Sequence, residues 1–436
     1  MNERVMKKTI RMAGAAVSFW RRASIGGISA LLVYFISSDR HLITDVLMLP
    51  SYQLNSIVML LSVLVLVPWI IIRRVRFAAI VRSGWPLTLL ILSCIIADWS
   101  SPLHTKCSIF LIESIFGVLL AAEYSGAEQQ EITAITFGGL VVLSWSVMIF
   151  IPHLGEHHGI IPEDIKHAGT WRAIFWHKDQ LGGVMGLACI FFLYRLLKGP
   201  PARMKILSTL FFLLSAILLW QSHSVTSLVA TSLTLCFLCL LFSGMLPTSV
   251  RYAFIGLGLC VGLVLPLAVA FFIFYHPAST WIPEWLMKDP TISGRLLVWK
   301  QTWLYATQKP WFGHGFSFWD GMEGHRITAW MKFNPYNAHN GLLETFVVAG
   351  GVGVCLLLIA LTFSAFWVWH SLRTTTGDSP ARRDAEWLML FLVYFVCENI
   401  PASRILGTHQ LFWIFLLMLS LGRSIRVETE KSGSVA

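Results

Sequence analysis

Residues 341–369 read GLLETFVVAGGVGVCLLLIALTFSAFWVW, an apolar stretch that contains a single charged residue, Glu344. A helix needs about 20 apolar residues to cross the ~30 Å hydrocarbon core of a bilayer, and this stretch is longer. The residues just before it are mostly polar and include His339. The sequence therefore predicts a transmembrane helix that begins at a membrane surface, with His339 at its entrance.

The composition of the rest of the chain agrees with this stretch. Of 436 residues, 56% are hydrophobic and only 13% are charged, which excludes an ordinary soluble domain of this size. We expect an all-α integral membrane protein, a single polytopic domain over residues 1–436 with about twelve transmembrane helices. The expected spans are 24–38, 55–72, 86–98, 105–122, 133–151, 182–197, 205–220, 224–242, 252–275, 341–369, 385–400 and 408–422.

The distribution of the 33 Lys and Arg residues predicts the orientation. When the N-terminus is placed in the cytoplasm, the connections on that side carry the larger share of these residues, as the positive-inside rule requires. Residues 423–436 then form a cytoplasmic tail, and residues 152–181 and 276–340 form two long outer loops. Long loops are usually functional. The net charge of +10 needs no nucleic-acid partner to explain it.

The second outer loop contains a helical pattern of its own. Ser293 could cap it, Arg295 lies at its start, and Lys309-Pro310 would end it. One face carries Leu296, Trp299 and Trp303. We expect this helix to lie in the membrane interface with its aromatic residues at headgroup depth.

His339 is our candidate for acid–base chemistry, because an imidazole can exchange protons near neutral pH. The alternative is a helix-capping or surface histidine. Asn340 follows it directly, and Gly350, Gly351 and Gly353 deeper in the same stretch would allow a neighbouring helix or an acyl chain to pack closely.

Cationic residues on the outer side could bind phosphate. Arg172 and Lys178, with His177 between them, come just before an expected span, and charges there are costly unless paired or hydrated. The alternative is a snorkelling arginine and a surface ion pair between Lys178 and Asp179. Arg295, at a helix start, is a second phosphate candidate, or else an anchor in the lipid headgroups.

Other polar residues near the outer ends of spans are weaker candidates. Arg404 could also contact phosphate, and Glu398 is an ionisable group within a span. Ser222 and Ser224 could hold a sugar or phosphate, or simply cap helices. A separate set of residues has zinc-ligand chemistry but matches no helical zinc motif such as H-E-x-x-H, so we expect no metal site: His153, Glu156, His157, His158 and His167.

Several of these segments together resemble the bacterial O-antigen ligase and polymerase superfamily. His339-Asn340 followed by Gly350-x-x-Gly353 is similar to the histidine signature of that superfamily. Three further segments resemble it in the same order, namely 172–182, 294–299 and 310–316, the last of which reads PWFGHGF and contains His314. The resemblance covers most of the chain from about residue 105 to residue 420.

The resemblance implies a C-type membrane glycosyltransferase of the bacterial inner membrane, with its active site facing the periplasm. Such an enzyme takes a glycan from an undecaprenyl diphosphate donor, inverts the anomeric centre, and needs neither a metal nor a cofactor. Arg172 and Arg295, with Lys178, would bind the donor diphosphate, and His339 would accept a proton from the attacking hydroxyl. Candidate substrate contacts are His177, Asn340, Ser222, Ser224, Glu398, Arg404 and His314.

The acceptor separates two branches of this superfamily. The segments 177–182 and 398–401 resemble exopolysaccharide polymerases more closely, although Lys-Asn is commoner there than Lys178-Asp179. A polymerase extends one lipid-linked repeat unit with another, and a chain-length regulator would be a further candidate partner. The alternative is a ligase that acts on lipid A core in lipopolysaccharide biosynthesis. A lipid-linked oligosaccharide flippase or transporter is the third candidate, but that class predicts midplane charges and an internal repeat.

Overall fold

The computed structural model describes residues 22–33, 80–82, 84–99, 105–158, 167–199, 201–242, 295–330, 335–375, 377–406 and 411–433. Within these ranges the chain is all-helical, apart from one isolated β-bridge between Glu156 and Trp171. The expected spans at 55–72 and 252–275, and Ser293, lie outside the described residues.

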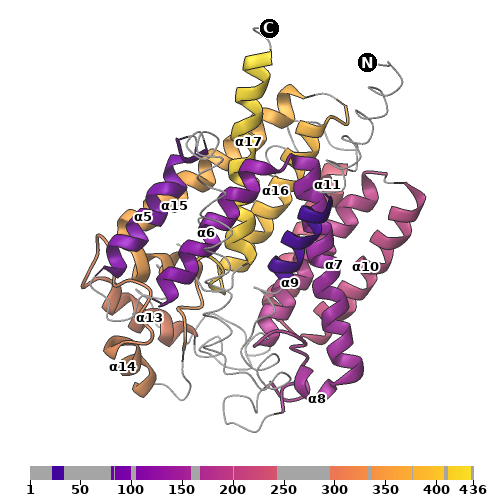
Figure 1. Cartoon of the computed structure of the whole chain (residues 1–436). Coiled ribbons are helices and arrows are strands. Elements are labelled where there is room, and N and C mark those ends of the chain that lie inside the picture. Colours follow the sequence, from indigo (N-terminus) through magenta and orange to yellow (C-terminus); the bar gives the residue numbers. More distant parts are fainter. Residues whose placement is uncertain are drawn as a thin grey trace, which may run out of the picture.

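The long helices coincide with the other expected spans and pack side by side (Figure 1). They are Arg22–Val33, α5 (Trp85–Asp98), α6 (Thr105–Glu123), α7 (Gly126–Phe150), α9 (Lys178–Leu197), α10 (Ala202–Gln221), α11 (Val225–Phe242), α15 (Gly341–Thr374), α16 (Pro380–Asn399) and α17 (Leu411–Gly433). Among the described residues, four helices are long and apolar enough to cross a membrane, namely α7, α9, α10 and α15. The structure therefore supports a helical membrane protein.

Some boundaries differ from the expected ones. Helix α7 begins at Gly126, seven residues before the expected residue 133. Ser125 and Glu128 form a capping box there, and the first turns of the helix are polar. Helix α9 begins at Lys178 instead of residue 182, which places Lys178 and Asp179 on the helix. Helix α17 continues to Gly433, so most of the 423–436 tail is helical.

The described parts of the two long loops lie at one end of the helices, opposite the C-terminal end of α17 (Figure 1). They contain the short helices α8 (Pro152–Gly155), α13 (Arg295–Ala306) and α14 (Met322–Trp330). Helix α13 confirms the helix expected in the second loop. Its predicted apolar face is only partly right: Trp303 is exposed, but Trp299 is buried beside Val298.

Helix α15 is broken at Gly350, which has φ 66° and ψ −168°. The chain's own 310–316 loop fills the break. Gly351 N donates to Pro310 O at 2.7 Å and His314 N donates to Val347 O at 2.7 Å. A Cβ at Gly350 would lie 2.2 Å from the Trp311 carbonyl oxygen. Gly350 and Gly351 therefore admit a loop at the break. A Cβ at Gly353 would lie 3.5 Å from Leu90 of helix α5, so a neighbouring helix packs at that glycine, as expected.

Ion pairs lie at the other end of α9. Lys198 Nζ is 2.5 Å from Glu386 Oε2, and Arg382 Nε is 3.1 Å from Glu386 Oε1. The Tyr194 hydroxyl donates to the Arg383 carbonyl at 2.8 Å. These contacts join the end of α9 to the start of α16, and so fix the helices that carry the polar groups described next.

Candidate active site

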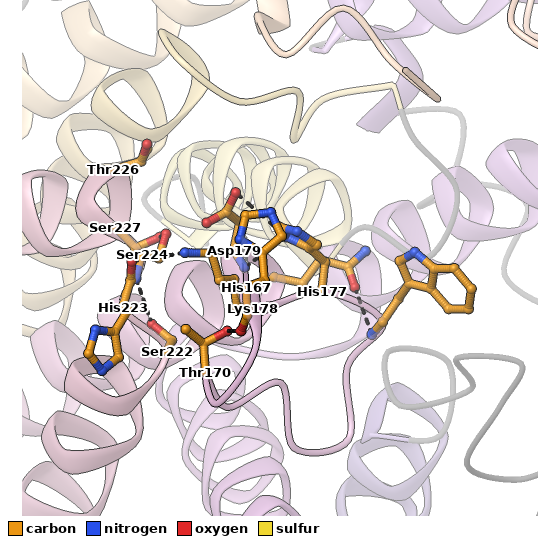
Figure 2. Close-up of polar contacts among 12 residues, drawn as sticks. His167, Thr170, His177, Lys178, Asp179, Ser222, His223, Ser224, Thr226 and Ser227 are labelled. Atoms are coloured by element: carbon orange, nitrogen blue, oxygen red, sulfur yellow. Dashed lines mark hydrogen bonds and ion pairs between the residues drawn. The ribbon is translucent and has the colours of Figure 1, made fainter. Parts of the chain in front are cut away.

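Polar residues from four helices converge at the end of the bundle that carries the long loops. Helix α9 starts there because the His177 side chain accepts the Asp179 N–H, at 3.2 Å, as its N-cap. The turn between α10 and α11 faces this start, and Lys178 Nζ donates to the His223 carbonyl at 3.2 Å (Figure 2). The starts of α9 and α11 thus form one wall of a candidate site.

Asp179 lies at the centre of this group. Its Oδ2 is 3.7 Å from Arg295 Nη2 and 3.6 Å from His177 Nδ1. The Ser224 hydroxyl lies beside the same carboxylate. About a quarter of the Asp179 side chain is exposed. Asp179 therefore joins α9 to the first residue of α13 and to the α10–α11 turn.

Arg404 approaches Asp179 from the segment after α16. Its Nη2 donates to the Asp179 carbonyl and lies 3.2 Å from Glu398 Oε1. Glu398 is fully buried and also accepts the Ser227 hydroxyl at 3.1 Å. Ser227 in turn contacts Ser224, Oγ to Oγ, at 3.1 Å. These contacts connect Asp179, Arg404, Glu398, Ser227 and Ser224 in one network, in which the Glu398 carboxylate offsets the positive charge of Arg404.

His339 lies in the loop that leads into α15, partly buried, with φ 49°. Its N–H donates to Asn337 Oδ1 at 2.8 Å, and the Ala338 N–H donates to Glu344 Oε2 at 2.6 Å. A positive φ in a non-glycine residue is strained and must be held by its surroundings. These two hydrogen bonds hold the loop in that conformation.

The surroundings of His339 keep its imidazole neutral. Its pKa is lowered to about 4, chiefly by burial and then by the positive charges of Arg295 and Arg404, while the Asp179 carboxylate opposes the shift. His339 is therefore close enough to all three groups to be acted on by their charges. A neutral imidazole at pH 7 has a free lone pair and can accept a proton.

His177 is partly buried within a group of three histidines. Its ring centroid is 5.0 Å from that of His167 and 5.3 Å from that of His157. Burial lowers the His177 pKa to about 3, against the raising effect of Asp179. Within the described ranges, no group of three or more His, Cys, Asp or Glu side chains could hold a metal ion. His177 instead caps α9 and supports Asp179.

Two other expected phosphate ligands lie outside the Asp179 network. Arg172 Nε donates to the Leu154 carbonyl at 3.3 Å, and its backbone N–H donates to Gly155 at 2.8 Å. Lys178 is held by the α10–α11 turn. Both residues belong to the loop and helix start that border the network, and no contact in the described part of the chain joins Arg172 to Arg295.

Three of the expected substrate contacts have hydrogen-bond partners within the protein. Asn340 caps α15, accepting the Leu343 N–H at 2.9 Å and donating to the Ile400 carbonyl at 2.9 Å. The Ser222 hydroxyl donates to the Leu219 carbonyl at 2.6 Å. The His314 ring bonds to the Tyr305 carbonyl at 2.8 Å. These side chains shape the loops around the site.

Residues 210–358 match the O-antigen ligase family, and this match implies glycan transfer of the O-antigen ligase or polymerase type. The chain thus contains an O-antigen ligase family domain. It covers about a third of the chain, from α10 into α15, and includes Arg295 and His339 but neither Asp179 nor Arg404. No curated protein matches the chain.

Asp179, Ser227 and Glu344 were not predicted from the sequence as members of the site. Asp179 was treated only as a surface partner of Lys178, whereas its carboxylate contacts Arg295. A usable signal was present: an acid in the first turn of a membrane helix, flanked by His177 and Lys178, is expensive unless its charge is compensated.

Proposed function

We propose that this protein transfers a glycan from an undecaprenyl diphosphate donor to an acceptor hydroxyl at the periplasmic surface of the inner membrane. The observation that carries the proposal is the grouping of a neutral His339 with Arg295, Asp179 and Arg404 at one end of an apolar helical bundle. The O-antigen ligase family domain, which contains both His339 and Arg295, supports it.

Each part of the site has a role in this reaction. The acceptor oxygen attacks the anomeric carbon, and the bond from that carbon to the phosphate oxygen breaks with its electron pair on the phosphate. The hydroxyl proton passes to the neutral His339 imidazole. Arg295, with Arg172 and Lys178 at the border, offsets the charge of the departing diphosphate. A single displacement of this kind inverts the anomeric centre and needs no metal ion.

The lipid part of the donor fits the same arrangement. A polyprenyl chain must remain among apolar side chains while its diphosphate lies just outside the hydrocarbon. Helix α10 carries exposed apolar residues along its length and ends at the Ser222 turn, beside the start of α9. Membrane lipids would cover this surface, and the diphosphate would meet Arg295 at the level where the helices begin.

Within this class we propose the polymerase branch, in which the acceptor is another lipid-linked repeat unit. The support is the resemblance of residues 177–182 and 398–401 to exopolysaccharide polymerases. In the structure, Asp179 and Glu398 from these segments join one network with Arg404. The branch is therefore proposed from residues that lie beside the reacting groups and outside the matched family domain.

The glycan profile of a deletion strain tests this proposal. Loss of long secreted polymer, with single lipid-linked repeat units accumulating, is the result expected for a polymerase. Loss of O-chains from lipid A core, with lipid-linked polymer accumulating, would identify a ligase. Unaltered polymers, with lipid-linked units trapped on the cytoplasmic side, would overturn glycan transfer and indicate a flippase.

A further inference from the structure

The proposed diphosphate site contains a negative charge of its own. Arg295, the first residue of α13, already has a carboxylate partner in Asp179, at 3.7 Å. Among the described residues, Arg295 Nη1 also lies 3.5 Å from Thr226 Oγ1, a weak hydrogen bond. A phosphate that binds Arg295 must therefore compete with Asp179 for the same guanidinium group.

Asp179 is held in place independently of Arg295. His177 Nδ1 lies 3.6 Å from the carboxylate, Ser224 lies beside it, and Arg404 donates to the Asp179 carbonyl. Three elements thus fix this residue. If Arg295 turns toward a ligand, the Asp179 carboxylate remains beside the bound phosphate.

We propose that Asp179 is a positioning residue that holds Arg295 in the free protein and, by competing with the diphosphate, promotes release of the polyprenyl diphosphate product. This inference rests on the proposed function. Asparagine has the same shape as aspartate but carries no charge. The Asp179→Asn variant therefore tests the competition between Asp179 and phosphate for Arg295 without changing the packing.

The chemistry of the two ligands gives the competition a direction. In the donor both phosphates are esterified, so the diphosphate carries about two negative charges. After transfer the terminal phosphate is free, and its further ionisation near pH 6 adds negative charge. A fixed carboxylate beside the site therefore repels the product more strongly than the donor. The arginines alone would retain the product. Asp179 favours its release and its replacement by a new donor molecule.

The test is the affinity of the purified full chain, in detergent, for a short polyprenyl diphosphate, with farnesyl diphosphate as the probe. We expect Asp179→Asn to bind it about tenfold more tightly than wild type, because a nearby like charge is removed. Multiple-turnover transfer should then slow while the first turnover is retained. Asp179→Glu keeps the charge and should resemble wild type.

Asp320→Asn is the matched control. Asp320 pairs with Lys106 at 2.7 Å in the second long loop, so this variant removes one paired carboxylate outside the Asp179 network. It should leave probe affinity unchanged. If Asp179→Asn does not fold, Asp179→Ser removes the same charge and carries the same expectation.

The outcomes separate the two claims. If wild type binds the probe and Arg295→Ala weakens binding, but folded Asp179→Asn binds no more tightly than wild type, the role given to Asp179 is overturned and the diphosphate site stands. If wild type binds no probe and Arg295→Ala changes nothing, the diphosphate site itself fails.

Discussion

His339 combines the properties that a general base needs. It is partly exposed, so a substrate can reach it, and its pKa is lowered to about 4 by burial and by the charges of Arg295 and Arg404. The imidazole is therefore ready to accept a proton over the whole physiological range. Its left-handed backbone, φ 49°, is held by hydrogen bonds from the same loop.

The first prediction concerns the pH dependence of transfer. A base with a pKa of about 4 loses its free lone pair only as the pH falls through that value, so kcat/KM should stay level from about pH 8 to about pH 5 and fall below it. An acid limb centred at the ordinary histidine value of 6.5 would contradict the account.

The same pKa shift affects stability. The unfolded chain takes up a proton on this histidine near pH 6.5, while the folded chain does so only near pH 4. Below pH 6.5 the unfolded state therefore binds more protons, and the free energy of unfolding declines as the pH falls from 6.5 to 4. The assay accordingly needs a melting temperature at each pH, so that loss of folding is not mistaken for loss of the base.

Glu344 gives a second prediction at this scale. Its buried carboxylate accepts the Ala338 N–H at 2.6 Å and the Trp319 Nε1–H at 3.1 Å, and so holds the His339 loop. We expect Glu344→Ala to reduce kcat about tenfold with little change in donor KM, because the base loses its position. Glu344→Gln keeps an acceptor oxygen, so its kcat should lie between those of Glu344→Ala and wild type. An equal loss of kcat in both variants would show that acceptance of the Ala338 N–H is not what matters.

The sequence predicted individual site residues where a residue type carried the signal alone. His339 and Arg295 were selected because a histidine and an arginine at a membrane surface are chemically conspicuous. Asp179 was missed because its role depends on Arg295 and Arg404, which are far away in the sequence. Asn340 was selected as the neighbour of His339 in the His-Asn signature; in the structure its side chain caps α15.

At the scale of the element, the break in α15 connects the second long loop to a membrane helix, because residues 310–316 hydrogen-bond to the helix there. The 310–316 loop satisfies the backbone groups freed at Gly350, and the same helix begins directly after Asn340. The break thus joins the second long loop to the helix that carries His339.

We predict that Gly350→Ala destabilises the protein by about 2–4 kcal/mol, because an alanine there has a strained φ of 66° and meets the Trp311 carbonyl. Thermal unfolding in detergent measures it. Gly351→Ala is the matched control, since its nearest neighbour would be Pro310 O at 3.2 Å without a positive φ. Equal melting temperatures for the two variants would contradict this reading of the break.

Apolar periodicity predicted most of the helices but not their polar ends. The capping box of α7 and the His177 cap of α9 extend both helices beyond their apolar stretches. Nor did the glycines of α15 reveal what packs against them. The same pattern suits a helix, an acyl chain or a loop, and only the fold brings residues 310–316 to Gly350.

At the scale of the whole molecule, composition and hydropathy were enough to predict a helical membrane protein with its polar chemistry at one end. The number of spans and the orientation remain predictions, because two expected spans lie outside the described residues. The site is formed by residues from four helices, so its arrangement could not be predicted from any single segment of the sequence.

The orientation predicts opposite labelling of the two ends. In a variant without native cysteines, a cysteine at His325 in α14 should react with a membrane-impermeant maleimide added to the periplasmic side. A cysteine at Asp378, whose side chain is 54% exposed before α16, should react only after the membrane is permeabilised. The reverse pattern would place the site in the cytoplasm and exclude a periplasmic transferase.

The most direct test of the account is transfer by purified His339→Ala protein in proteoliposomes, with a radiolabelled undecaprenyl diphosphate-linked repeat unit. His325→Ala, in the exposed helix α14, is the matched control. We predict that His339→Ala loses transfer by a factor of about 10² to 10⁴ while its melting temperature and donor binding stay near wild type. Wild-type turnover by a folded His339→Ala variant would contradict the central claim that this histidine is the base.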